Sequence, residues 1–400
     1  MEIAHTAWQV LSAALVFMLG VLVSIKIGAA FVTSGKRSLI LYLWHSLLCF
    51  IYVLYVLDSG GDALSYYQRS LYGGITFSLG TAAIEFITTF FSSGLGLSVL
   101  GTFLVYNLFG FIGLLAFDAT LQSATADKSR QIRRFATFIV FLPSVSFWSS
   151  AIGKDAISFM AAGLALWAAQ HLKQRAWLMA LAIALMLLVR PHIAALMVMA
   201  VAVSMMVQPR VSLKQRLLVG GLALATAVVM VPVAMTASGL AGNAGIAEVT
   251  DFVDLRQSYN LEGGGGIDIA SMSLPMKLFT YLLRPLPFEA HSILSLAASL
   301  DNVVLLWLVL VGAWQMLHRR PATGVANRVF LWVYAISAWL ILAMTTANLG
   351  ISTRQKWMFA PMLIYLFISV IGKPRRRVPD VHDDATGSLH AAPPSLRRRP

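Results

Sequence analysis

Leu39–Leu57 is an apolar run that ends abruptly at Asp58-Ser-Gly-Gly-Asp62-Ala-Leu-Ser-Tyr66-Tyr67-Gln-Arg69. Two glycines in succession allow a tight, unhindered turn. We therefore expect a membrane span that ends at the membrane surface and presents Asp62 there, with Tyr66 and Tyr67 one helical turn further on. A carboxylate in that position can act as a general base, bind a metal or orient a hydroxyl. The alternative is a helix cap followed by interfacial tyrosines.

The composition predicts a polytopic membrane protein. The chain has 400 residues, of which 58% are hydrophobic and 12% are charged, whereas a soluble domain has about 25% charged residues. Its mean hydropathy is +0.76. The single cysteine, Cys49, lies inside an apolar run, so no disulfide framework is expected. We predict an all-α transmembrane bundle of about eleven spans over residues 1–372.

The basic residues indicate which connections face the cytoplasm. Of the 30 Lys and Arg, 21 fall in alternate connections and in the tail, at 36–37, 128–134, 173–175, 210–216, 319–328 and 373–399. The positive-inside rule places these in the cytoplasm and the N-terminus outside. The net charge of +13 is then a topogenic signal with some attraction to membrane lipids, and nucleic acid is not expected as a partner.

For the basic connections to alternate with the others in this way, residues 72–92 must not cross the membrane, and an interfacial helix fits them. The first extracytoplasmic loop is then 58–94. The one long extracytoplasmic connection, 237–292, is either a mobile lid or a disordered solvent loop. The tail 373–400 is expected to be a disordered basic cytoplasmic segment. A divalent metal is conceivable, but no clear ligand set supports one.

The same assignment of connections to the two sides of the membrane places five polar clusters at helix ends on the extracytoplasmic face. Pro191 breaks the apolar run 176–207, so we expect a hairpin there with Arg190 and His192 at its tip. Charged residues at membrane depth are usually functional, although a single one often anchors a helix to headgroups. Together the clusters predict a basic, carboxylate-bearing cavity that holds an anion. They are Asp58/Asp62, Lys154/Asp155, Arg190/His192, Arg284 with Pro285, and Arg354/Lys356.

At this point the chain resembles the GT-C-type membrane glycosyltransferases and the related O-antigen or exopolysaccharide polymerases of bacterial envelope polysaccharide assembly. The resemblance is carried by an acidic residue in the first extracytoplasmic loop, Asp62, followed by interfacial helices. Short motifs around Trp148–Asp155, Arg190–His192, Leu283–Pro285 and Asn348–Lys356 are similar to those of such proteins. Many of these enzymes carry a paired acidic motif, whereas here Asp58 and Asp62 are four residues apart.

The resemblance implies a sugar donor on a polyprenyl phosphate, a glycan acceptor, and a multi-pass protein of the bacterial inner membrane whose active face is extracytoplasmic. Asp62 is the candidate base, and a single base acting directly would invert the anomeric centre. The candidate substrate-binding residues are Tyr66, Tyr67, Lys154, Asp155, Arg190, His192, Arg284, Arg354 and Lys356. The alternatives are a polymerase that uses a whole lipid-linked repeat unit and, in a different class, a transporter or flippase for the lipid-linked glycan.

Overall fold

The computed structural model describes residues 5–207, 265–318 and 327–372, together with scattered residues between 212 and 228. These residues are mainly helical, and the described part contains no strand beyond an isolated bridge between Gly266 and Asn348. Within the described residues, five helices are long and apolar enough to cross a membrane, which indicates a membrane protein: α1, α2, α5, α14 and α15. The all-helical class is therefore confirmed for the described residues, while the count of about eleven spans and the loop arrangement stay predictions.

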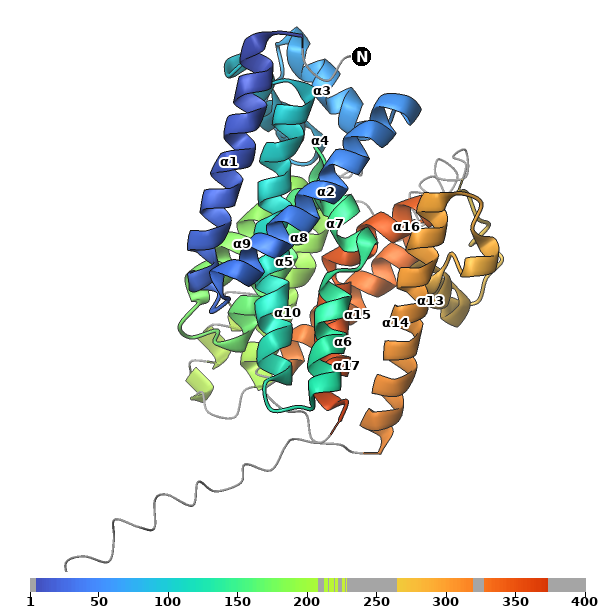
Figure 1. The fold of residues 1–400 in the computed structure, drawn as a ribbon. Coiled ribbons are helices and arrows are strands. Elements are labelled where there is room, and N and C mark those ends of the chain that lie inside the picture. Colours follow the sequence, from blue (N-terminus) through green and yellow to red (C-terminus); the bar gives the residue numbers. More distant parts are fainter. Residues whose placement is uncertain are drawn as a thin grey trace, which may run out of the picture.

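The N-terminal half forms a helical bundle with a small helical layer at one end. Figure 1 shows α3 and α4 at the end of the bundle where α2 finishes and α5 begins. The elements in order are α1 (Ala7–Ala30), α2 (Gly35–Ser59), α3 (Asp62–Tyr72), α4 (Thr81–Thr89), the π-helix η1 (Phe90–Gly94), α5 (Val99–Thr125), α6 (Arg130–Val140), α7 (Pro143–Ser149) and α8 (Lys154–Gln170).

The remaining helices complete the bundle. They are α9 (Ala176–Val189), α10 (Pro191–Val207), α13 (Leu274–Leu283), the 3-10 turn η2 (Pro287–Glu289), α14 (Ile293–Leu317), α15 (Arg328–Thr345), α16 (Leu349–Gln355), the 3-10 turn η3 (Lys356–Met358) and α17 (Ala360–Val370). Residues 237–264 of the expected long loop, and the expected tail 373–400, lie outside the described residues.

The segment after α2 has the helical character that the sequence predicts, with different internal boundaries. Gly60 and Gly61 both have positive φ, at 73° and 123°, a conformation that glycine adopts easily. The chain turns there, and α3 begins at Asp62. Residues 72–92 do not form one helix; they divide into an irregular stretch, α4 and most of η1.

The centre of the bundle is the contact between α5 and α8, whose backbones approach closely because glycines face each other. A Cβ on Gly113 would lie 2.7 Å from the Phe159 carbonyl oxygen, and a Cβ on Gly163 would collide with the backbone of Gly113. Small residues let apolar helices pack backbone to backbone in this way. Throughout its length, α8 is almost wholly buried.

Polar contacts fix the opposite end of the bundle. Buried Lys128 donates to the carbonyl oxygens of Ile368, Ser369 and Ile371 at 2.6–2.8 Å, which ties the α5–α6 connection to the end of α17. In the first turn of α2, Arg37 forms a bidentate pair with Asp118 of α5. Bidentate Arg–carboxylate pairs are geometrically specific, so the order of helices at this end is well defined.

Gly163→Ala should lower the free energy of unfolding by about 1 to 3 kcal/mol, because the added methyl group overpacks the α5–α8 contact. Thermal unfolding of the purified protein in detergent would measure this. Gly94→Ala is the matched control, since a Cβ there meets no atom closer than 3.7 Å. Equal melting temperatures for the two variants would contradict the close-packing account.

Candidate functional site

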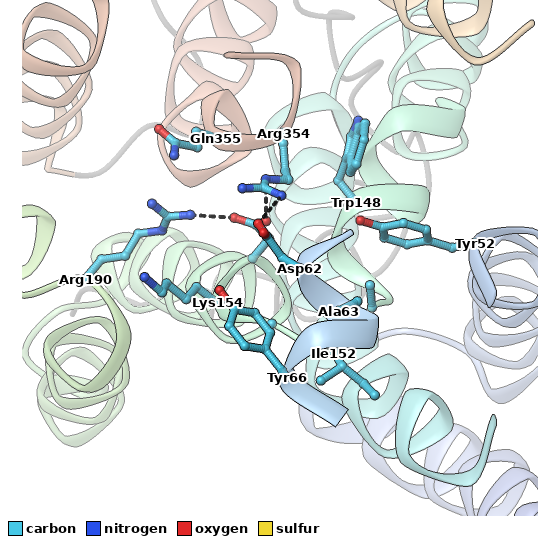
Figure 2. A pocket seen from close by; sticks show the side chains of 13 residues that line it. Tyr52, Asp62, Ala63, Tyr66, Trp148, Ile152, Lys154, Arg190, Arg354 and Gln355 are labelled. Carbon is cyan, nitrogen blue, oxygen red and sulfur yellow. Dashed lines mark hydrogen bonds and ion pairs between the residues drawn. The ribbon is translucent and has the colours of Figure 1, made fainter. Parts of the chain in front are cut away.

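A cavity of about 120 Å³ lies where five separate parts of the chain meet. The end of α2 contributes Tyr52, and α3 contributes Asp62 and Tyr66. The other polar lining residues are Lys154 and Asp155 at the start of α8, Arg190 between α9 and α10, and Arg354 and Gln355 at the end of α16. Figure 2 shows Arg190 and Arg354 directed toward the centre of the site beside Asp62, with Lys154 and Tyr66 next to them.

Local sequence features bring each charged group to a helix end. Gly153, whose φ is +154°, makes the sharp turn that places Lys154 and Asp155 at the N-terminus of α8. Pro191 starts α10 directly after Arg190, so the helix break expected from the sequence is present. The backbone N–H of Arg190 still donates to Met186, which keeps this residue as the cap of α9.

Asp155 holds two guanidinium groups at once. Its Oδ1 accepts from Arg190 Nη2 at 2.7 Å, and its Oδ2 lies 3.0 Å from Arg354 Nε. Both Asp155 and Arg190 are largely buried, with side chains 16% and 8% exposed. Opposite charges in such a place stabilise one another strongly because there is little water to screen them. The pKa of Arg354 is raised further above its ordinary value, chiefly by the Asp155 charge.

Asp62 is the accessible carboxylate of the cavity. Arg354 Nη1 donates to Asp62 Oδ2 at 3.1 Å, while the other carboxylate oxygen of Asp62 has no partner among the described residues. The Asp62 side chain is 59% exposed. Because both oxygens of Asp155 are occupied by arginines, Asp62 is the carboxylate better placed to accept a proton from a bound molecule.

The cavity has more donors than its own acceptors use. Two carboxylates face three cations, and Arg190 Nε is buried without a hydrogen-bond partner. No contact with an acidic group is made by the Lys154 ammonium among the described residues. Burial and the neighbouring Arg190 lower the pKa of Lys154 to about 8, so the ammonium is mostly charged near neutral pH. These features fit an anion that brings several oxygen acceptors.

Aromatic rings form the wall beside these charges. Tyr52 stacks on Phe147 with ring centroids 4.3 Å apart and meets Trp148 edge to face at 5.5 Å. Tyr52, Trp148 and Gln355 line the cavity but were not among the residues predicted from the sequence. Two of the three are close in sequence to a predicted residue: Trp148 precedes the Lys154 turn, and Gln355 follows Arg354.

Four predicted residues lie outside this cavity. Arg284 pairs instead with Glu289, five residues later, and its Nε donates to Glu289 Oε1 at 2.8 Å. Lys356 is fully buried and donates to Asn302 of α14. The Tyr67 hydroxyl donates to the Leu97 carbonyl oxygen at 2.9 Å. Half-buried His192 is not among the lining residues.

The sequence offered no clear set of metal ligands, and the described residues contain no group of three His, Cys, Asp or Glu that could hold a metal ion. In the cavity, the two carboxylates face arginines. This donor set is suited to an anionic ligand.

Asp155→Asn should destabilise the fold by about 3 kcal/mol, because it leaves the buried Arg190 guanidinium without its counter-charge and leaves Arg354 paired with Asp62 alone among the described carboxylates. Asp62→Asn removes the same charge from a more exposed position, so the expected loss is below about 1 kcal/mol. The free energy of unfolding of each variant, measured in mixed micelles, would test this difference. A larger loss for Asp62→Asn than for Asp155→Asn would contradict the assignment of Asp155 as the structural anchor.

Comparisons of the chain with protein-family models, with curated proteins and with solved structures gave no match. Any function assigned to the cavity therefore rests on the chemistry of its own residues.

Proposed function

We propose that the protein is a membrane glycosyltransferase of cell-envelope or exopolysaccharide biosynthesis. It would take sugar from a polyprenyl-phosphate-linked donor on the extracytoplasmic face of the bacterial inner membrane, with Asp62 as the base. One observation carries the proposal: Lys154, Arg190 and Arg354 surround one small cavity with unused hydrogen-bond donors, and a single accessible carboxylate stands beside them.

The three cations form the phosphate site of this proposal. Asp155 fixes Arg190 and Arg354 relative to each other, so their remaining donors are held in place before a ligand arrives. Preorganised donors of this kind stabilise negative charge as it develops on a departing phosphate. Lys154 adds a point charge at the same cavity.

The size of the cavity limits what it encloses. Pockets for whole small ligands are usually about 300 Å³ or larger, whereas this one is about 120 Å³. It accommodates the phosphate and adjacent atoms of a donor, while the isoprenoid tail and the acceptor lie beyond it. The aromatic wall of Tyr52, Tyr66 and Trp148 offers flat apolar surfaces to a sugar ring at the mouth.

In the proposed reaction the acceptor hydroxyl attacks the anomeric carbon and the bond from that carbon to the phosphate oxygen breaks. Asp62 takes the hydroxyl proton, and the phosphate leaves with the bonding electron pair, held by the arginines and Lys154. One displacement inverts the anomeric centre. The unpartnered oxygen of Asp62 is the atom available for that proton.

A polymerase that transfers a whole lipid-linked repeat unit is the second candidate, because it needs the same phosphate contacts. The observation that favours it is the pair of arginines, Arg190 and Arg354, bound to one carboxylate. Labelled lipid-linked monosaccharide and labelled lipid-linked repeat unit, supplied separately to the purified protein, would distinguish the two reactions.

Asp62→Asn should abolish sugar transfer, a loss on the order of a hundredfold or more, because general-base catalysis contributes about that much. Incorporation of labelled sugar into polymer by membranes containing the variant would measure it. Asp58→Asn is the matched control: Asp58 lies in the last turn of α2, four residues before Asp62, and does not line the cavity. Normal polymer from Asp62→Asn, at normal expression, would remove Asp62 from the reaction.

Anion affinity should fall as the pH rises through about 8. The pKa of Lys154 lies at about 8 instead of its ordinary 10.5, so the ammonium is charged below that pH and neutral above it. Losing one charge-assisted contact is expected to weaken binding about fivefold to tenfold. Titration of the protein with sulfate would show this, because sulfate keeps its charge over that range.

Lys154→Arg provides the control, since a guanidinium stays charged at these pH values and the pH-dependent step should disappear. If the step persists unchanged in that variant, another group is responsible and Lys154 does not contact the anion.

A further inference from the structure

A second and larger hollow lies at the other end of α8. Its volume is about 720 Å³, and Arg130, Arg133, Arg134, Trp167, His171 and Arg175 are among its lining residues. Lys154 begins α8 and His171 follows its last residue, so the helix separates the two cavities by about 25 Å at 1.5 Å per residue. That separation is close to the thickness of the hydrocarbon core of a bilayer, about 30 Å.

Three arginines line this hollow from one face of α6. Positions 130, 133 and 134 are spaced by three and four residues, so their side chains are neighbours on the helix surface. All three are exposed, and no acidic partner is recorded for them in the part of the chain that the structure describes. Like charges at this spacing destabilise a helix, and cations in its first turn oppose the helix dipole. A bound anion would relieve both effects.

Of the other charged residues around the hollow, Arg37 is paired with a carboxylate, and Arg175 adds a further positive charge. Arg37 is neutralised by its bidentate pair with Asp118, which also accepts from Gln122. Arg175 lies over the Trp167 ring at 3.8 Å from its centroid and donates to the Trp167 carbonyl oxygen. Asp127 is near in sequence but does not line the hollow. The net field in the hollow is therefore positive.

One wall of the hollow is apolar. Phe31 and Val32, at the turn between α1 and α2, line it together with Trp167. Val32 is 85% exposed, and this turn lies in the lower half of the bundle as drawn in Figure 1. Inorganic phosphate would use the arginines alone. A molecule that joins a phosphate to hydrocarbon would use both walls.

We propose that this hollow binds the phosphate-bearing headgroup of an anionic phospholipid, with Arg130, Arg133 and Arg134 as its ligands. Arginine suits the site because its planar donors bind phosphate oxygens in a bidentate way, which a lysine ammonium cannot do. The site is separate from the cavity around Asp62 and does not depend on the function proposed for it.

Native mass spectrometry of the purified full chain in detergent, with phosphatidylglycerol or phosphatidylcholine added, tests the proposal. We expect a saturable copy of phosphatidylglycerol that is absent with phosphatidylcholine. Arg133→Lys with Arg134→Lys should weaken its retention about fivefold or more, because a lysine ammonium cannot replace the bidentate phosphate contact of a guanidinium, although the charge and the positive-inside signal are unchanged. Lys173→Gln is the control, because it removes a basic charge from the nearby α8–α9 connection without touching the lining.

Two results would overturn the proposal. If the double lysine variant retains the lipid fully while Lys173→Gln loses it, unspecific charge attraction explains the binding. If inorganic phosphate or pyrophosphate displaces the lipid and itself binds just as tightly, the site recognises a free phosphate. Arg130→Lys offers an independent arm should the double variant fail to give a monodisperse protein.

Discussion

The candidate site depends on a single carboxylate that binds two guanidinium groups inside a helical bundle. Asp155, on α8, accepts from Arg190 and contacts Arg354, residues that lie 35 positions later and 199 positions later in the chain. Burying any one of these charges alone would be strongly unfavourable. The start of α8, the α9–α10 break and the end of α16 must therefore meet, and their meeting forms the cavity.

This arrangement leaves the cavity with one positive charge more than its carboxylates neutralise. Asp155 is used on both oxygens and Asp62 on one, so the remaining donors of Arg190 and the ammonium of Lys154 point to a ligand that supplies acceptors. A fold built for stability alone would pair these donors internally, since buried unsatisfied donors are unfavourable. The excess is the physical reason to regard the cavity as a binding site.

The sequence predicts those features that depend on local chemistry. The apolar run 176–207, broken at Pro191, forms α9 and α10, because a helix in an apolar environment needs a largely apolar stretch. Pro191 marks the helix break beside which Arg190 lines the cavity, and Gly60 and Gly61 mark the turn before Asp62. Each of these residues affects the backbone only in its immediate neighbourhood, so its effect can be predicted without knowing the tertiary structure.

The residue with which each basic side chain pairs was harder to predict, because it depends on which acidic and polar groups the tertiary structure places nearby. Arg284 has the same setting as Arg190, a basic residue before a proline at a helix end, yet its acid is Glu289 in the following turn. Lys356 is two residues from Arg354 but enters the interior and binds Asn302. Lys356 begins a short 3-10 turn, whereas Arg354 belongs to α16, so the two side chains point in different directions. The sequence does not specify where such a turn begins. Tyr52 lines the cavity although it lies inside the apolar run 39–57, where the sequence carries no sign of a binding role.

The buried helix α8 connects the two ends of the molecule. Gly163 and a series of alanines allow it to lie against α5 without space between the backbones, so its two ends are fixed with respect to each other. One end positions Lys154 and Asp155 in the small cavity, and the other is followed by His171 and Arg175 in the basic hollow. Side chains at the ends of a rigid helix move together with the helix. A change in the packing of α8 would therefore shift the lining residues of both cavities.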